Sequence, residues 1–115
     1  MAEKQIKVVV KKVDKLLDMN NYAEVMYIQN DLSELQNIVN GYIEAVPFPN
    51  VNNASIILNE DGKYNNLIPN IFVPEIDDVI VGNFLVVGVK GEDFCSLTEE
   101  QILNVINYIN LHRVL

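Results

Sequence analysis

The sequence predicts an α+β domain, with a small mixed or antiparallel sheet of about five to six strands and two helices. Three observations lead to this fold class. Short segments rich in Ile and Val alternate between apolar and polar residues, as strands do. Two segments, at about residues 32–40 and 99–111, instead have the helical period and follow capping residues. Half of the 115 residues are hydrophobic, so the chain can form one core, and we expect a single domain over residues 1–115.

The first expected strand covers residues 5–13. Apolar side chains share one face and lysines the other, namely Ile6, Val8 and Val10 against Lys7 and Lys11. This alternation predicts a half-buried strand whose lysines are solvated. A connection with a turn at Asn20–Asn21 follows, and then a second short strand over residues 24–29.

The expected helix over residues 32–40 has signals at both ends. Asp31 is placed to cap the first amides, and Glu34 follows at the capping-box spacing. The apolar stripe consists of Leu32, Leu35, Ile38 and Val39. Asn40–Gly41 should close the helix, with the glycine as the left-handed residue.

Strands and turns are expected in the middle of the chain. "YIEAVPF" is a strand ended by prolines, and "ASIILN" at residues 54–59 is another. "EDGK" reads as a tight turn in which Gly62 has positive φ, because its spacing fits neither a calcium loop nor a phosphate loop. "YNNLIPNIFVPEI" is expected to be a loop, since Pro69 and Pro74 interrupt it.

The remaining elements are one or two strands and the second helix. "DDVIVGNFLVVGV" is strand-like, and Gly82 either bends it or lets another group approach closely. "KGEDF" is a second hairpin-type turn. In the helix over 99–111, Thr98 and Gln101 form a capping box. This helix is apolar over much of its girth, so it could also form a homodimer.

Charge and composition limit the function. The formal net charge is −8, with +3 on residues 1–15 and −11 on residues 16–115. An acidic surface repels phosphate backbones, so nucleic-acid binding is not expected. Cys95 is the single cysteine and no signal peptide is visible, which indicates the cytoplasm. No apolar run approaches the roughly 20 residues that span a membrane, so no membrane association is expected.

No set of residues predicts a catalytic centre. His112 is the single histidine, and nothing in the spacing brings it to Cys95. Three acidic pairs, Glu60–Asp61, Asp77–Asp78 and Glu92–Asp93, lie at expected turns, where carboxylates are commonly just solvated. We therefore expect no enzyme activity, no metal site and no cofactor.

Five motifs in residues 31–101 resemble a family of small domains of unknown function from Gram-positive bacteria, their mobile elements and phages. They are "GYIEAV", "NEDGK", "PN", "DDVIVGNFLVVG" and "SLTEE". The resemblance covers residues 31–111, while residues 1–30 look more divergent. It implies a compact cytoplasmic domain, and these signature positions: Gly41, Tyr42, Ile43, Glu44, Asn59, Glu60, Gly62, Asn70, Asp78, Ile80 and Gly82. The basic residue that usually follows "PN" in the family is Ile71 here, which weakens the case for an anionic ligand at that loop.

The candidate binding residues lie near the middle turns. Asn59, Glu60 and Asn70 can either cap backbone groups or hold a ligand. Tyr64 and Phe72 flank the proline-containing segment and are expected at a ligand or partner surface.

The leading functional hypothesis is an accessory protein of a phage or mobile element that acts by binding a protein partner. One version is counter-defence, in which the acidic domain occupies a basic nucleic-acid-binding cleft of a host protein. The alternatives are a module for a small, nucleotide-like ligand, with Asn59, Asn70 and Tyr64 around a pocket, and a metal-dependent hydrolase that uses paired acids.

Overall fold

The computed structural model describes residues 3–13 and 22–114. Its two helices and its main antiparallel sheet confirm the predicted α+β class. The turn predicted at Asn20–Asn21 lies outside the described residues. In chain order the elements are β1 (Gln5–Lys11), β2 (Glu24–Gln29), α1 (Leu32–Val39), β3 (Ile43–Pro47), β4 (Ala54–Asn59), β5 (Pro69–Val73), the 3₁₀ helix η1 (Pro74–Ile76), β6 (Asp78–Val81), β7 (Phe84–Lys90), β8 (Asp93–Cys95) and α2 (Glu99–His112).

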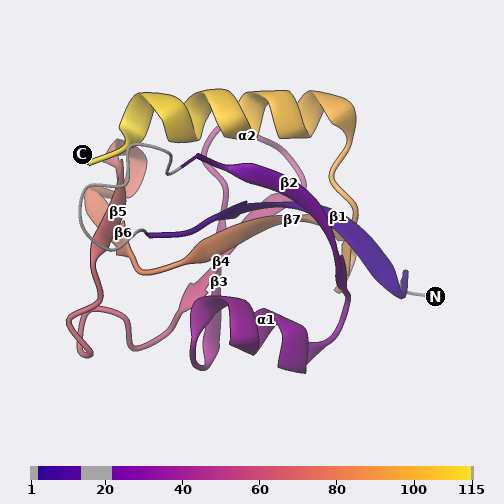
Figure 1. Ribbon diagram of the computed structural model, residues 1–115. Helices are drawn as coiled ribbons and strands as arrows, with labels where there is room; N and C mark the ends of the chain where they lie inside the picture. The colour runs from indigo at the N-terminus through magenta and orange to yellow at the C-terminus, as the bar shows by residue number, and fades with distance from the viewer. Residues whose placement is uncertain (1–2, 14–21, 115) are drawn as a thin grey trace.

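The main sheet lies between the two helices. Its strand order is β2-β1-β7-β4-β3, with β8 paired to β7, and every pairing is antiparallel. In Figure 1 the sheet is seen from the side of its β2 edge, with α2 above the sheet and α1 below it. Neither helix in the described part of the chain is long and apolar enough to cross a membrane.

Two hydrophobic clusters fill the spaces on either side of the sheet. Under the sheet, Ile6, Val8 and Val10 pack with Leu35 and Val39 of α1. Above it, a second cluster joins the sheet to α2 and to the β5–β6 ribbon; it includes Val9, Ile56, Ile71, Ile80, Phe84, Val105 and Ile109. The sheet is therefore covered on both faces, and residues 84–87 of the central strand β7 are apolar and buried on both sides.

The prediction of a half-buried first strand with solvated lysines is wrong for Lys11. This residue is 1% exposed. Its Nζ donates hydrogen bonds to Asn70 Oδ1 at 2.9 Å and to the Lys12 carbonyl at 3.2 Å. The alternation predicts burial only of the face that carries Ile6, Val8 and Val10. The other face is also covered, because α2 and the β5–β6 ribbon pack over it. Lys7 lies on the same face but remains partly accessible, and it pairs with Glu99 at 2.8 Å.

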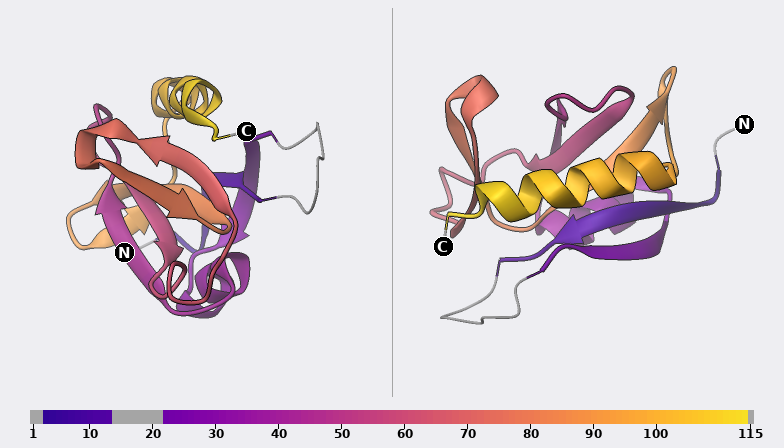
Figure 2. Two further views of the ribbon diagram at one scale, coloured as in Figure 1. Left: turned by 90° about the vertical axis from the view of Figure 1, so that its left-hand side faces the viewer. Right: turned by 90° about the horizontal axis from the view of Figure 1, so that it is seen from above.

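The segment predicted as a loop over residues 64–76 contains strand β5. This strand pairs with β6 in a separate two-stranded ribbon, which lies at one end of the main sheet (Figure 2). The prediction was wrong because both prolines occupy positions that tolerate them. Pro69 is the first residue of β5, and Pro74 begins η1.

Two glycines act differently from the prediction. Asn40, with φ of 64°, is the left-handed residue that closes α1. A Cβ on Gly41 would instead lie 2.7 Å from Asn59 Nδ2. Among the described glycines, positive φ occurs at Gly82 and Gly91 and not at Gly62. A Cβ on Gly62 would lie 2.8 Å from Val81 Cγ2, so close packing and not turn geometry requires glycine at this position.

Candidate functional site

A groove lies where β3 and β4 of the main sheet face β6 of the ribbon. We call it the β3–β6 groove; its volume is about 440 Å³. Three of the motif segments line it: Glu44 comes from "GYIEAV", residues 59–63 are "NEDGK", and residues 78–81 belong to "DDVIVGNFLVVG". The complete lining is Glu44, Val46, Leu58, Asn59, Glu60, Asp61, Gly62, Lys63, Tyr64, Ile76, Asp78, Val79, Ile80 and Val81.

The turn that forms one wall of the groove is fixed by hydrogen bonds to α1. Asn59 Nδ2 donates to the carbonyls of Val39 and Asn40, at 3.0 and 3.2 Å. Asn59 Oδ1 accepts from the Asp61 amide at 2.8 Å. The Glu60 amide donates to the Tyr42 carbonyl at 2.9 Å. The Asn59 side chain therefore holds the groove wall in place and satisfies the last carbonyls of the helix.

The groove combines a half-buried apolar floor with an acidic rim. Val46, Leu58 and Val79 are partly buried, whereas Glu44, Glu60 and Asp61 are exposed. Lys63, the basic residue of the lining, bonds to Asp78 on the opposite wall. The Lys63 ammonium holds the pKa of the Asp78 carboxyl below its usual range, so Asp78 is ionised at neutral pH. Tyr64 lies at the groove and is 90% exposed.

The structure brings three of the five candidate binding residues to this groove: Asn59, Glu60 and Tyr64. Asn70 lies elsewhere. It is buried, and its Nδ2 donates to the carbonyls of Lys11 at 3.1 Å and Gly82 at 2.9 Å. Phe72 is 38% exposed on β5, where it stands opposite Val79.

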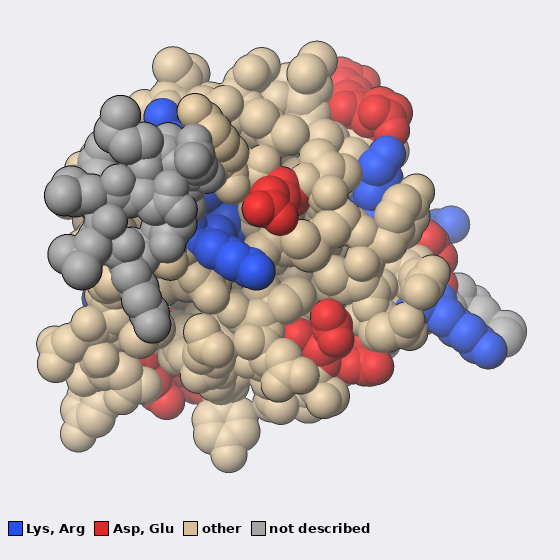
Figure 3. All heavy atoms as spheres, in the orientation of Figure 1, with Lys and Arg blue, Asp and Glu red and all other residues tan. Residues whose placement is uncertain are grey.

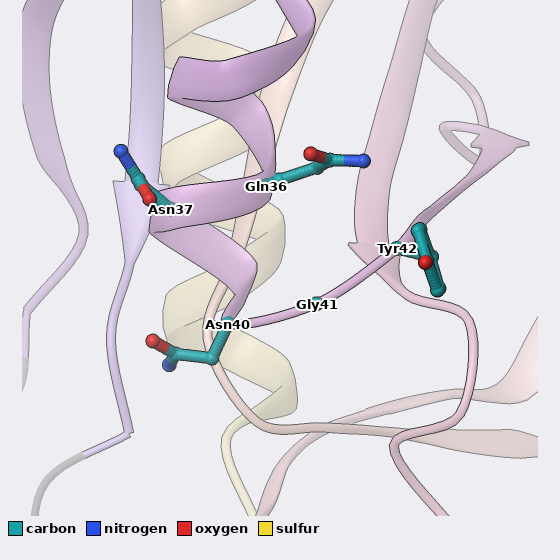
Figure 4. Close-up of a pocket in the computed structure, with 5 residues that line it drawn as sticks. All are labelled: Gln36, Asn37, Asn40, Gly41 and Tyr42. Atoms are coloured by element: carbon teal, nitrogen blue, oxygen red, sulfur yellow. The ribbon is translucent and has the colours of Figure 1, made fainter.

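A second, shallower hollow of about 330 Å³ lies at the end of α1. Figure 4 shows Gln36 and Tyr42 projecting to one side of the helix, while Asn37 and Asn40 project to the other. Its lining consists of three amide residues, a glycine and a tyrosine, and none of these side chains is charged. Sequence reasoning missed this hollow because it assigned Asn40 to the helix end and did not consider Gln36 or Asn37.

A cluster at the end of α2 was also missed. The Tyr108 hydroxyl donates to Glu75 Oε1, and Asn50 Nδ2 donates to Glu75 Oε2 at 3.1 Å. The His112 ring stacks on the Tyr108 ring with centroids 3.9 Å apart. Burial and the Glu75 carboxylate raise the pKa of Tyr108, and the Tyr108 hydrogen bond lowers the pKa of Glu75. The cluster ties η1 to α2, and the four-residue spacing of Tyr108 and His112 was its one signal in the sequence.

The groups considered for catalysis are dispersed. Within residues 3–13 and 22–114, no three or more His, Cys, Asp or Glu side chains are arranged to hold a metal ion. Cys95 precedes α2 and His112 ends it, so about 20 Å of helix separates them. Burial raises the pKa of the Cys95 thiol, which disfavours the reactive thiolate.

Comparison with known proteins gives a family but no activity. The family model described as "Domain of unknown function (DUF3846)" matches residues 6–110. This range contains β1 and β2 as well as the segments with the five motifs. Searches of curated proteins and of solved structures found no match. The chain therefore belongs to the DUF3846 family of domains of unknown function.

Proposed function

We propose that the protein acts by binding a basic segment of a partner protein in the β3–β6 groove. The observation that supports this most directly is the composition of the groove walls. Four carboxylates surround a partly apolar floor, and the lysine among them is already paired with Asp78; the carboxylates belong to Glu44, Glu60, Asp61 and Asp78.

Such a groove suits a lysine or arginine side chain. The aliphatic stem of either residue can cover apolar surface while its charged head stays near water and carboxylates. In the groove, Leu58 and Val46 offer the apolar contact, and Glu44 and Glu60 are exposed beside them. The net charge of −8 also attracts a basic partner over longer distances.

The acidic charge supports a specific version of this function. A host protein that binds nucleic acid has a basic cleft, and an acidic domain of a phage or mobile element can block it. The nucleotide-like ligand alternative has less support, because the groove carboxylates would repel phosphate groups and Asn70 does not reach the groove.

The experiment that tests this function uses a synthetic peptide of alternating lysine and valine. Amide chemical shifts of the ¹⁵N-labelled protein are followed as the peptide is added. We expect the shift changes to concentrate at residues that line the groove. Charge reversal by Glu60→Lys should raise the Kd at least about tenfold.

Glu100→Lys is the matched control, since it makes the same charge change on α2, outside the groove. We expect it to alter the Kd by less than about threefold. Equal weakening by both variants would show a non-specific charge effect and refute the groove as the site. Shift changes located away from the groove would refute it as well.

A further inference from the structure

The β2 edge of the main sheet has no strand partner among the described residues other than β1. Figure 1 shows β2 at the front of the sheet, and the right panel of Figure 2 shows it at the outer margin beside β1. A free sheet edge presents unpaired backbone groups, which can pair with another strand.

The hydrogen-bond pattern identifies which backbone groups are free. The Asn30 amide donates to the Lys4 carbonyl at 2.8 Å, and the register continues with Gln5 opposite Gln29. In an antiparallel ladder, hydrogen-bonded pairs alternate with pairs that do not bond to each other. The N–H and C=O groups of Val25, Tyr27 and Gln29 therefore point outward from the sheet.

The two edges of this sheet differ in their protection. On β3, the Phe48 amide donates to the Ala54 carbonyl, so the alternating pattern makes the backbone of the preceding residue, Pro47, point outward. Pro47 has no N–H to donate there, which blocks strand addition. β2 has the sequence EVMYIQ, with no proline, glycine or lysine, and its pairing with β1 has no bulge. Apart from the charge of Glu24 at its first position, β2 therefore lacks proline, lysine and bulges, which are devices that usually prevent edge pairing.

The surface around β2 suits a second copy of this chain. Val25 is 43% exposed and Tyr27 is 67% exposed, on the same face of the strand. Figure 3 shows the side of the molecule that carries this edge; its described residues are mostly uncharged, with small separate patches of both signs. Because no single charge dominates the described residues on this side, two copies can approach here despite the net charge of −8.

We propose that two copies of this chain associate by antiparallel pairing of their β2 strands. With the two-fold axis at Met26, Val25 of each copy stands opposite Tyr27 of the other, and the outward backbone groups of these residues face one another. This register forms aromatic–aliphatic cross-strand pairs and places Glu24 opposite Ile28 instead of another charge. The interface is self-complementary, and the inference does not rest on the proposed groove function.

Sedimentation equilibrium across micromolar to submillimolar concentrations tests this association. We expect the wild-type mass to rise toward twice the 13.0 kDa of one chain. Tyr27→Pro removes an outward N–H without removing a bond to β1, and should raise the dimer Kd at least about tenfold. Ala45→Pro makes the equivalent change on the β3 edge, and should leave the Kd unchanged.

Tyr27→Lys keeps every backbone group and serves as a second edge variant if the proline variant loses its cooperative unfolding transition. A wild-type protein that stays at the mass of one chain at all concentrations would overturn the proposal. So would a dimer that neither Tyr27 variant weakens, since a different surface must then hold the copies together.

Disulfide trapping tests the register. In a Cys95→Ser background, Met26→Cys places two thiols across the proposed two-fold axis, with Cβ atoms about 5 Å apart. We expect rapid covalent dimer formation under mild oxidation, while Ala45→Cys on the other edge remains mostly monomeric. Equal rates for both variants would overturn the proposed axis.

Discussion

The side chain of Asn70 joins segments that are distant in the sequence. Its amide nitrogen donates to carbonyls on β1 and at Gly82, and its oxygen accepts from the Lys11 ammonium. All of these groups are buried from water. Asn70 therefore anchors the β5–β6 ribbon to the main sheet through hydrogen bonds that water cannot replace.

Asn70→Ala should destabilise the protein by about 2–4 kcal/mol, because buried polar groups lose their partners without gaining solvent. Urea unfolding at neutral pH measures this change. Asn37→Ala is the matched control, since Asn37 is exposed on α1 and should tolerate alanine with a change below about 0.5 kcal/mol. Similar stability of the two variants would contradict the anchoring role.

The sequence left two interpretations open at Asn59 and Asn70, and the reason is physical. An asparagine beside a turn can satisfy local backbone or face a ligand, and the choice depends on which distant groups reach it. Lys11 lies 59 residues before Asn70. Similarly, Gly41 and Gly62 were assigned to turn geometry, because the neighbours that crowd them, Asn59 and Val81, become visible only in three dimensions.

At the scale of elements, the N-terminal starts of the helices were the most predictable features. Thr98 Oγ1 accepts from the Gln101 amide at 3.1 Å, and Gln101 Oε1 accepts from the Thr98 amide at 2.8 Å. The Gln101 side chain also donates to the carbonyls of Asn52 and Asn53. The capping residue Gln101 therefore also makes a tertiary contact, which fixes the start of α2 beside the loop before β4.

Thr98→Ala should lower the free energy of unfolding by about 1 kcal/mol, since the first turn of α2 loses its side-chain acceptor. Thr98→Ser keeps the hydroxyl and should restore most of this loss. Chemical denaturation of the three proteins gives the comparison. If serine and alanine behave alike, the hydroxyl does not stabilise the helix start.

Periodicity predicted most elements, because local alternation reflects which residues face a core. It failed for β1 and β5 for different reasons. On β1, the lysines suggested solvent, yet Val9 and Lys11 face a second packed layer. On β5, Pro69 suggested a break, but the first position of an edge strand accepts proline. Both errors concern the ribbon and α2, whose placement depends on long-range packing.

For the whole molecule, charge and stability are linked through the ion pair that spans the groove. The Lys63–Asp78 pair connects the turn after β4 to β6. Asp78 has a folded-state pKa below its ordinary value of 3.8. Its ionised form therefore stabilises the fold fully above that value, and this stabilisation disappears as the pH falls through the lower, folded-state pKa.

Asp78→Asn should lower the free energy of unfolding at pH 7 by about 0.2–1 kcal/mol, the range for a solvent-screened pair. The difference from wild type should shrink as the pH falls below the ordinary Asp value and vanish below the lowered folded-state pKa of Asp78, where both proteins are neutral at this site. Asp77→Asn is the control, because Asp77 has a left-handed backbone that asparagine accepts. Urea titrations across the pH range distinguish the two variants, and a pH-independent Asp78 effect would contradict the ion-pair origin.

The central place of β7 has a consequence for how the chain is made. β7 pairs with β1, β4 and β8, and β1 and β4 are translated long before it. Until the ribosome has released Lys90, those two strands lack the neighbour that joins them. The β2–β1 pair and the β4–β3 pair therefore cannot be joined until most of the chain has been made, and during that interval their unshielded aliphatic faces are exposed to chaperones and to aggregation.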